Sequence, residues 1–419
     1  MDRQDLEAEL NRCAVCGKCR AVCPVFIETL DESKVARGRI RLASAYLRGG
    51  VSATKKLSES VNSCLECFRC EANCPSGVDY GLVIHGIRAE MAMRRPMPIL
   101  LRFALRRLLF WRRGFDVAMR LVSLLSRAVP RRGKRLRYLP LFVLGSGGMP
   151  AIKRRTALSR MRGRGESSAG ETVVFFVGCL MNYTYPEAAE DCVEVLEQLG
   201  LRVVVPEDQL CCGAPAFSLG DLEAVRRLAR RNQEVLLRHN PSAIVVGCAT
   251  CAGVLRKEYP RLLGDEFAGL ASKVRSFSEF LAERGEIDWG SERRTKVTYH
   301  DPCRLKWQQD IHAEPRSLLR EAADFVEMED ADMCCGLGGI IGLLHPDVSA
   351  KLGDKKARSV MDSGAEAVAT ECPGCMLQLE DWLLASGSAI EVKHIGQVVR
   401  ERMVGGRLRR KEKTVTGRQ

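Results

Sequence analysis

The run C-x2-C-x2-C-x3-C-P occurs twice near the start of the chain, and it restricts what the protein can fold around more than any other feature. The first run is Cys13, Cys16, Cys19, Cys23 and Pro24, and the second is Cys64, Cys67, Cys70, Cys74 and Pro75. Zinc sites usually pair two C-x2-C knuckles or add histidines, whereas here three cysteines precede each Cys-Pro. The spacing therefore predicts iron–sulfur clusters.

Bacterial two-cluster ferredoxins have the same spacing, and in them the fourth cysteine of each run ligates the cluster of the other run. We expect two cubane [4Fe-4S] clusters, one held by Cys13, Cys16, Cys19 and Cys74, and the other by Cys64, Cys67, Cys70 and Cys23. Such clusters transfer electrons one at a time, so the chain is predicted to be a redox protein.

The 19 cysteines are expected to be thiolate ligands rather than disulfides. The first residues, MDRQDLEAE, are rich in acids and contain no apolar signal region, which indicates the reducing cytosol. The longest charge-free stretch, around residues 138–152, is too short to cross a bilayer and is broken by Pro and Gly. We expect a cytoplasmic protein whose membrane contact, if any, is peripheral on the inner face of the membrane.

The net charge of +13 comes from one segment. Residues 94–164 contain 20 Lys and Arg and a single acid, Asp116. Leu101, Leu105 and Leu109 recur there at helical spacing between arginines, which predicts a basic amphipathic helix. Three interpretations stay open: binding to an anionic membrane surface, docking on an acidic partner protein, and packing on the chain's own acidic domains. No nucleic acid is expected, because no nucleic-acid-binding fold accompanies the charge.

The remaining cysteines form two matching sets. An offset of 123 or 124 residues pairs Cys179 with Cys303, Cys211 and Cys212 with Cys334 and Cys335, and Cys248 and Cys251 with Cys372 and Cys375. One residue of slippage over a whole domain indicates a duplication. Cys192 has no counterpart and is expected to be a buried apolar residue. Five histidines show no ligand spacing with the cysteines: His85, His239, His312, His345 and His394.

Both copies have the pattern of an α/β domain. ETVVFFV, LRVVVP and SAIVV in the first copy, and TKVTYH, DFVEM and EAVAT in the second, are typical of short buried parallel strands. Helical patterns lie between them, and each cysteine group follows a strand, at the end where open α/β sheets place their sites. Cys211 and Cys212 can serve one site only if the chain turns there, and Gly213 permits that turn. Five cysteines exceed the four ligands of zinc or of a cubane, which favours a larger iron–sulfur assembly.

This order of Cys, Cys-Cys-Gly and C-x2-C resembles the cysteine-rich CCG domain of heterodisulfide reductases and their relatives. A two-cluster ferredoxin followed by two CCG domains is similar to the D subunit of heterodisulfide reductase, the glycolate oxidase iron–sulfur subunit and the C subunit of the anaerobic glycerol-3-phosphate dehydrogenase. ARGRIRLA and CPSGVDY are similar to the glycolate oxidase type, and GCLMNYTYPEA to the glycerol-3-phosphate type. The expected layout is a helical ferredoxin-like domain at 1–95, a basic linker at 96–170, CCG domains at 171–290 and 291–405, and a basic tail at 406–419.

The resemblance also implies ligand sets for one or two noncubane [4Fe-4S] clusters. One would be held by Cys179, Cys211, Cys212, Cys248 and Cys251, and the other by Cys303, Cys334, Cys335, Cys372 and Cys375. Many glycolate oxidase subunits have incomplete final C-x2-C motifs, and this chain departs from them because both of its sets are complete.

Two functions are therefore weighed. In the first, a partner flavoprotein dehydrogenase oxidises a 2-hydroxy acid such as glycolate or lactate, and this chain relays electrons toward a quinone or another acceptor. No G-x-G-x-x-G follows a strand, so no flavin is expected on this chain.

In the second, the chain is a catalytic subunit that reduces a disulfide, with Cys303, Cys334, Cys335, Cys372 and Cys375 as the catalytic group. His300 and Asp301 could then supply a proton; the alternative is that they only form hydrogen bonds at the end of the strand. A zinc-loaded scaffold is a third possibility.

Overall fold

The computed structural model describes residues 3–94, 106, 110, 114, 116–119, 121, 131–132, 135–136, 149–150, 152–164, 170–284, 287–289, 295–338, 342, 345–402 and 409–410. The predicted basic helix lies mostly outside these residues. No helix in the described part of the chain combines the length and apolarity that crossing a membrane requires.

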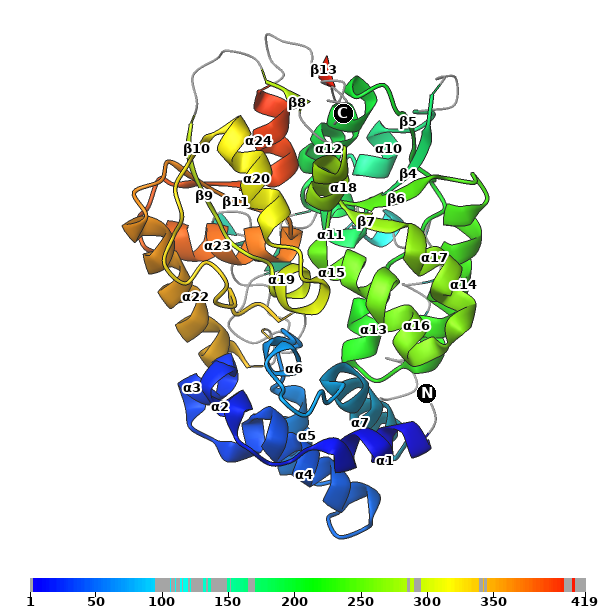
Figure 1. The fold of residues 1–419 in the computed structure, drawn as a ribbon, viewed down its shortest axis with the longest axis vertical. Coiled ribbons are helices and arrows are strands. Elements are labelled where there is room, and N and C mark those ends of the chain that lie inside the picture. Colours follow the sequence, from blue (N-terminus) through cyan, green and yellow to red (C-terminus); the bar gives the residue numbers. More distant parts are fainter. Residues whose placement is uncertain are drawn as a thin grey trace, which may run out of the picture.

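Residues 3–94 form a helical domain, drawn in blue in Figure 1. Its elements are α1 (Arg3–Arg12), α2 (Lys18–Val22), α3 (Pro24–Thr29), η1 (Glu32–Lys34), α4 (Ala36–Leu47), α5 (Lys55–Asn62), α6 (Arg69–Ala72) and α7 (Tyr80–Arg94). Apolar side chains of the longer helices make one core, in which Ala43, Tyr46 and Val61 are fully buried. The cysteine runs occupy the short helices and loops, so this core supports the ligand loops from one side.

The first repeat is a parallel four-stranded sheet in the order β5-β4-β6-β7. Its strands are β4 (Thr172–Phe176), β5 (Arg202–Val204), β6 (Ala243–Val246) and β7 (Val274–Ser276). Its helices are α11 (Cys179–Tyr183), α12 (Pro186–Gln198), α13 (Ala214–Ser218), α14 (Leu222–Leu237), α15 (Ala249–Gly253), η3 (Val254–Glu258), α16 (Tyr259–Leu263), η4 (Asp265–Phe267), α17 (Ala268–Lys273) and α18 (Phe277–Glu283). All four residues of β6 are buried, as expected for a strand covered on both faces.

The second repeat has the same topology, with a parallel sheet in the order β10-β9-β11-β12. Its strands are β9 (Lys296–Tyr299), β10 (Asp324–Phe325), β11 (Ala367–Thr370) and β12 (Glu391–His394). Its helices are α19 (Cys303–Gln309), α20 (Ala313–Ala322), α22 (Pro346–Asp362), α23 (Pro373–Ala385) and α24 (Ile395–Glu401). The predicted fold class is confirmed: a helical ferredoxin-like domain precedes two duplicated α/β domains with short parallel sheets.

The two repeats pack reciprocally. Helix α12 of the first repeat contacts α24 of the second, and α18 of the first contacts α20 of the second. Figure 1 shows these four helices together, above α11, α15 and α19, which begin at or just after cysteines of the two sets. Val195, Leu319 and Val399 are fully buried in their shared core. This arrangement turns the carboxyl ends of both sheets toward each other and toward the helical domain.

The other described elements are α10 (Ala157–Arg160), β1 (Arg131–Arg132), β2 (Arg135–Leu136), β3 (Met149–Pro150), β8 (Ile287–Asp288) and β13 (Arg409–Arg410). Described residues of the basic segment contact the first repeat. Arg106 makes two hydrogen bonds to Asp221, and the guanidinium of Arg227 stacks 4.3 Å from the centre of the Phe110 ring. At these residues, the structure favours packing of the basic segment on the chain's own acidic surface.

Candidate iron–sulfur centres

The first ferredoxin group surrounds a small cavity of about 30 Å³. Cys13, Cys16 and Cys19 of the first run line it together with Cys70 and Cys74 of the second run. Gly17, with a φ of +84°, turns the loop between Cys16 and Cys19, and a Cβ there would approach Arg37 Nη1 to 2.8 Å. The structure thus brings the expected set together, including the cysteine from the other run.

The second ferredoxin group is more deeply buried. Burial raises the pKa of the Cys67 and Cys70 thiols, and the charges of Cys64 and Cys23 raise both further. Cys23 therefore lies with the second run, as the crosswise assignment requires. Burial also raises the pKa of Cys23, an effect that the nearby Arg39 guanidinium partly offsets.

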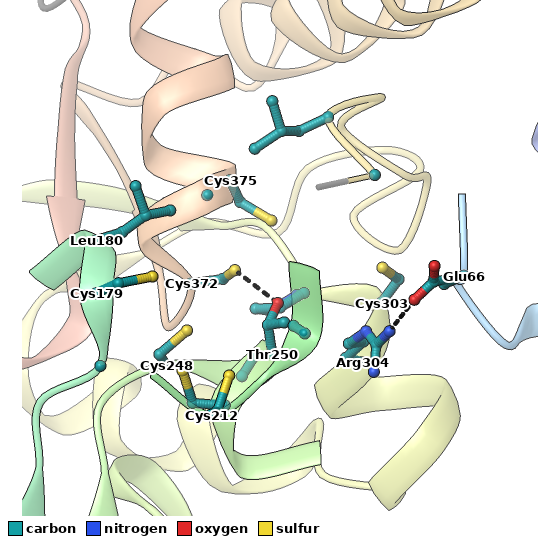
Figure 2. A pocket seen from close by; sticks show the side chains of 18 of the residues that line it. Glu66, Cys179, Leu180, Cys212, Cys248, Thr250, Cys303, Arg304, Cys372 and Cys375 are labelled. Atoms are coloured by element: carbon teal, nitrogen blue, oxygen red, sulfur yellow. Dashed lines mark hydrogen bonds and ion pairs between the residues drawn. The ribbon is translucent and has the colours of Figure 1, made fainter. Parts of the chain in front are cut away.

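The two CCG-type groups share one cavity of about 160 Å³, shown in Figure 2. Nine of the ten cysteines line it: Cys179, Cys212, Cys248, Cys251, Cys303, Cys334, Cys335, Cys372 and Cys375. The tenth, Cys211, hydrogen-bonds to Cys179 and Cys212. The sequence predicted two sites, and the structure places them side by side.

Both Cys-Cys-Gly turns have the predicted geometry. Gly213 and Gly336 adopt φ values of +95° and +91°, and each N–H donates to the Sγ two residues earlier, over 3.4 Å. A Cβ on Gly336 would lie 2.8 Å from the Ser349 carbonyl oxygen, so glycine is required there. The turn lets two successive cysteines face one site.

The thiols in this cavity interact closely. Cys335 Sγ and Cys375 Sγ are 3.5 Å apart, and Cys248 hydrogen-bonds to Cys372 across the two repeats. Hydrogen bonds from Cys248 and Cys375 hold the pKa of Cys372 well below its usual range, and Cys303 and Cys335 do the same for Cys334. All 19 cysteines are free thiols. Five convergent free thiols per repeat fit an iron–sulfur group.

The second repeat also touches the second ferredoxin group. The charge of Cys334 raises the pKa of Cys67 in addition to the effect of burial, and Cys23 and Leu65 pack in one apolar cluster with Cys334. Both repeats contact the helical domain, and Cys334 of the second repeat lies beside the second ferredoxin group.

A buried ion-pair network at this junction was missed by sequence reasoning. The Glu66 carboxylate accepts hydrogen bonds from Arg304 Nη2 at 2.5 Å, from Ser218 Oγ at 2.7 Å and from Arg88. Burial opposes ionisation, but Arg88 and Arg304 hold the pKa of Glu66 at about 2. The only sequence signal was position, since Glu66 lies between two ligand cysteines and Arg304 follows Cys303 directly.

The two residues proposed as proton donors differ in their surroundings. Asp301 makes a bidentate ion pair with Arg316, both bonds measuring 2.8 Å, which favours a structural role at the strand end. His300 is fully buried, and one of its ring nitrogens lies within 4.8 Å of the Sγ atoms of Cys335 and Cys375. Burial lowers the pKa of His300 to about 3.

Cys192 lies apart from these groups. It is fully buried on α12, with its Sγ 3.4 Å from His394 Nδ1 at the interface between the repeats.

Fold and cysteine groups together define an iron–sulfur protein built from a two-cluster domain and a duplicated cysteine-rich domain. Two family models match the chain, the Cysteine-rich domain at residues 173–256 and 297–380, and the 4Fe-4S dicluster domain at residues 9–78. The chain belongs to the family of iron–sulfur oxidoreductase subunits that combine CCG domains with a 4Fe-4S dicluster domain. The dicluster domain implies two cubane clusters.

Curated relatives match along nearly the whole chain. The probable glycolate oxidase iron–sulfur subunit of Bacillus subtilis is 30% identical, over 94% of this chain and 93% of the relative. The B subunit of fumarate reductase (CoM/CoB) from Methanothermobacter marburgensis is 30% identical, over 92% and 70%. The D subunit of dihydromethanophenazine:CoB–CoM heterodisulfide reductase from Methanosarcina barkeri is 25% identical, over 94% of each chain.

Proposed function

We propose that this chain is the electron-transfer subunit of an oxidoreductase whose partner flavoprotein oxidises a 2-hydroxy acid of the glycolate or lactate type. Electrons would leave toward a quinone or another acceptor. The probable glycolate oxidase iron–sulfur subunit of Bacillus subtilis, similar along nearly its full length, supports this substrate class. Bound iron–sulfur groups supply the one-electron steps that a two-electron flavin donor needs.

The observation that carries the proposal is the unbroken series of cysteine groups. Cys16 of the first group is exposed, where a partner could deliver electrons. The first and second groups meet where the charges of Cys19 and Cys23 interact. The second group meets the second repeat where the charges of Cys67 and Cys334 interact. The two repeats meet at a hydrogen bond between Cys372 and Cys248. Each group therefore borders the next, as a relay requires.

The test is reconstitution with the flavoprotein that co-purifies anaerobically from the native organism. Adding glycolate or lactate should bleach the cluster absorbance and produce the EPR signal of reduced cubanes. A Cys16→Ala variant should slow this reduction while direct chemical reduction of the other clusters persists. If no 2-hydroxy acid reduces the reconstituted pair, the proposal is wrong.

A second candidate, disulfide reduction, rests on the shared cavity. Cysteines of both repeats face one space, which Leu65, Leu180 and Leu337 also line. These apolar side chains would exclude water from a bound disulfide, and the facing thiol groups would lie on either side of it. Turnover of a small heterodisulfide by the chemically reduced protein, without any flavoprotein, would support this function, and its absence would reject it.

A further inference from the structure

The two repeats supply the same five cysteines but differ in the residue three positions before the first of them. Phe176 precedes Cys179 where, at the offset of 124, His300 precedes Cys303. Phe176 ends strand β4 and His300 directly follows strand β9. Both side chains are almost completely buried, with 0% and 1% of their surface exposed. One site therefore has a hydrocarbon ring, and the other an imidazole, at the same place.

The imidazole has no ordinary partner in the part of the chain that the structure describes. Neither Nδ1 nor Nε2 of His300 makes a hydrogen bond of normal length and angle. The Ala331 carbonyl lies nearby, but it already accepts the Asp301 N–H at 3.0 Å. Leaving a buried polar group unpaired costs about 1–3 kcal/mol, so such a side chain calls for a ligand.

The direction of the missing partner follows from the neighbours of the ring. One ring nitrogen of His300 lies within 4.8 Å of both Cys335 Sγ and Cys375 Sγ, which are 3.5 Å apart. An iron bound by these two thiolates would lie within reach of that nitrogen, since iron–ligand bonds are only about 2.0–2.3 Å long, as for zinc with the same donors.

We propose that a ring nitrogen of His300 ligates the iron–sulfur group of the second repeat, so that this site has a mixed sulfur and nitrogen donor set while the first repeat uses thiolates alone. The inference rests on the proposed presence of iron in both repeats.

The test uses full-length protein, purified anaerobically with ¹⁵N-labelled histidine and examined by pulsed EPR. We expect a strong ¹⁵N coupling in the reduced protein that disappears in His300→Phe, which copies the first repeat. The reciprocal Phe176→His variant should introduce a second coupling, and it tests the idea even if His300→Phe fails to fold. His394→Gln is the matched control, because that buried histidine already bonds to the Gly247 carbonyl and the Gly396 N–H.

The outcomes separate this inference from the proposed function. Iron that is lost on Cys335→Ala substitution, together with a ¹⁵N coupling of ligand strength, supports both. Iron in the second repeat with only a weak coupling or none overturns the histidine ligand and leaves the relay intact. An iron content unchanged by Cys335→Ala would show that these cysteines hold no iron, which overturns the histidine ligand, whereas the relay is tested separately by reduction with a 2-hydroxy acid.

Discussion

The two CCG repeats have the same sheet order and the same five cysteines, yet their sites differ in charge. Beside the first site lie Phe176, Leu180 and Asn232, whereas the second has His300, Arg304 and Lys356 in its vicinity. The duplication therefore kept the topology and the ligands, and varied the side chains around them. The charged side chains belong to the repeat that borders the second ferredoxin group.

The side chains that differ between the two repeats also make different contacts. Arg304 pairs with Glu66 of the helical domain, whereas Leu180, at the same position in the first repeat, only lines the cavity. Lys356 on α22 donates to the Asp330 carbonyl, and burial lowers its pKa to about 8. Asn232 on α14, at the position of Lys356, is uncharged. Its amide donates a hydrogen bond to the Cys211 carbonyl at 3.0 Å and accepts one from the Leu210 N–H at 2.8 Å. The second repeat thus has charged side chains where the first has neutral ones.

The largest expected effect concerns the order of the two repeats in the relay. Cys335→Ala and Cys212→Ala should each remove about four irons per chain. Only Cys335→Ala should also abolish electron transfer from the cubanes to the other repeat, because Cys334 of the second repeat lies beside Cys67 of the second ferredoxin group. Iron analysis and freeze-quench EPR would measure both effects. Equal retention of transfer in the two variants would contradict the assigned order.

The next effect concerns docking of the helical domain. Arg304→Leu copies the first repeat and leaves the buried Glu66 carboxylate with fewer partners, so it should destabilise the protein by about 3–5 kcal/mol. Anaerobic urea unfolding, followed by loss of cluster absorbance, would measure this. The Glu66→Gln, Arg304→Leu double variant should lose less than the sum of the single variants, because both remove the same bond. Strict additivity would mean that the pair does not couple the domains.

A third prediction concerns how stability depends on pH. It uses Glu258 of the first repeat, which corresponds to Trp382 in the second repeat at the offset of 124. Glu258 in the first repeat is fully buried beside His85 of the helical domain and Gln308 of the second repeat. Burial raises its pKa from 4.5 to about 7. The folded state therefore holds a proton that the unfolded state releases, so stability is complete below pH 4.5 and falls as the pH rises to about 7. The total loss is on the order of 3 kcal/mol.

Glu258→Gln should reduce the slope of stability against pH between pH 5 and 7 without removing it, because burial also raises the pKa of Glu371, to about 8. The matched control is Glu279→Gln in the same repeat, which removes a carboxylate paired with Arg256 and should keep the Glu258 slope. Urea midpoints measured across this range would decide between them. An unchanged slope in Glu258→Gln would assign the pH dependence to other groups, such as Glu371.

The sequence predicted those features that depend on local spacing. Three strands in each repeat (β4, β5 and β6, and β9, β10 and β11) and the Cys-Cys-Gly turns follow from short patterns of apolar residues, cysteines and glycines, whereas the fourth strand of each sheet, β7 or β12, was not predicted. The convergence of both cysteine sets on one cavity depends on the reciprocal packing of α12 with α24 and of α18 with α20, and no local pattern encodes that packing. The Glu66–Arg304 pair joins residues 238 positions apart, so it too required the structure.

The smallest expected effect compares the outer helices of the two repeats. Helix α14 binds the basic segment through Arg106, whose guanidinium donates to both carboxylate oxygens of Asp221 at 2.8 and 2.7 Å. Helix α22 instead reaches the helical domain through an ion pair of Lys355 with Glu28. Arg106→Ala should cost about 0.5–1 kcal/mol, because the Arg106 side chain is about a quarter exposed, and Lys355→Ala should cost less, because Lys355 is half exposed.

Asp221 distinguishes the ion pair from a helix cap. Its carboxylate also accepts the Ala224 N–H at 3.1 Å, as the N-cap of α14. Asp221→Ala should therefore cost about 1 kcal/mol more than Arg106→Ala in urea unfolding, and added salt should weaken only the part that both variants share. Equal losses in the two variants would show that the basic segment, rather than the cap, stabilises this end of α14.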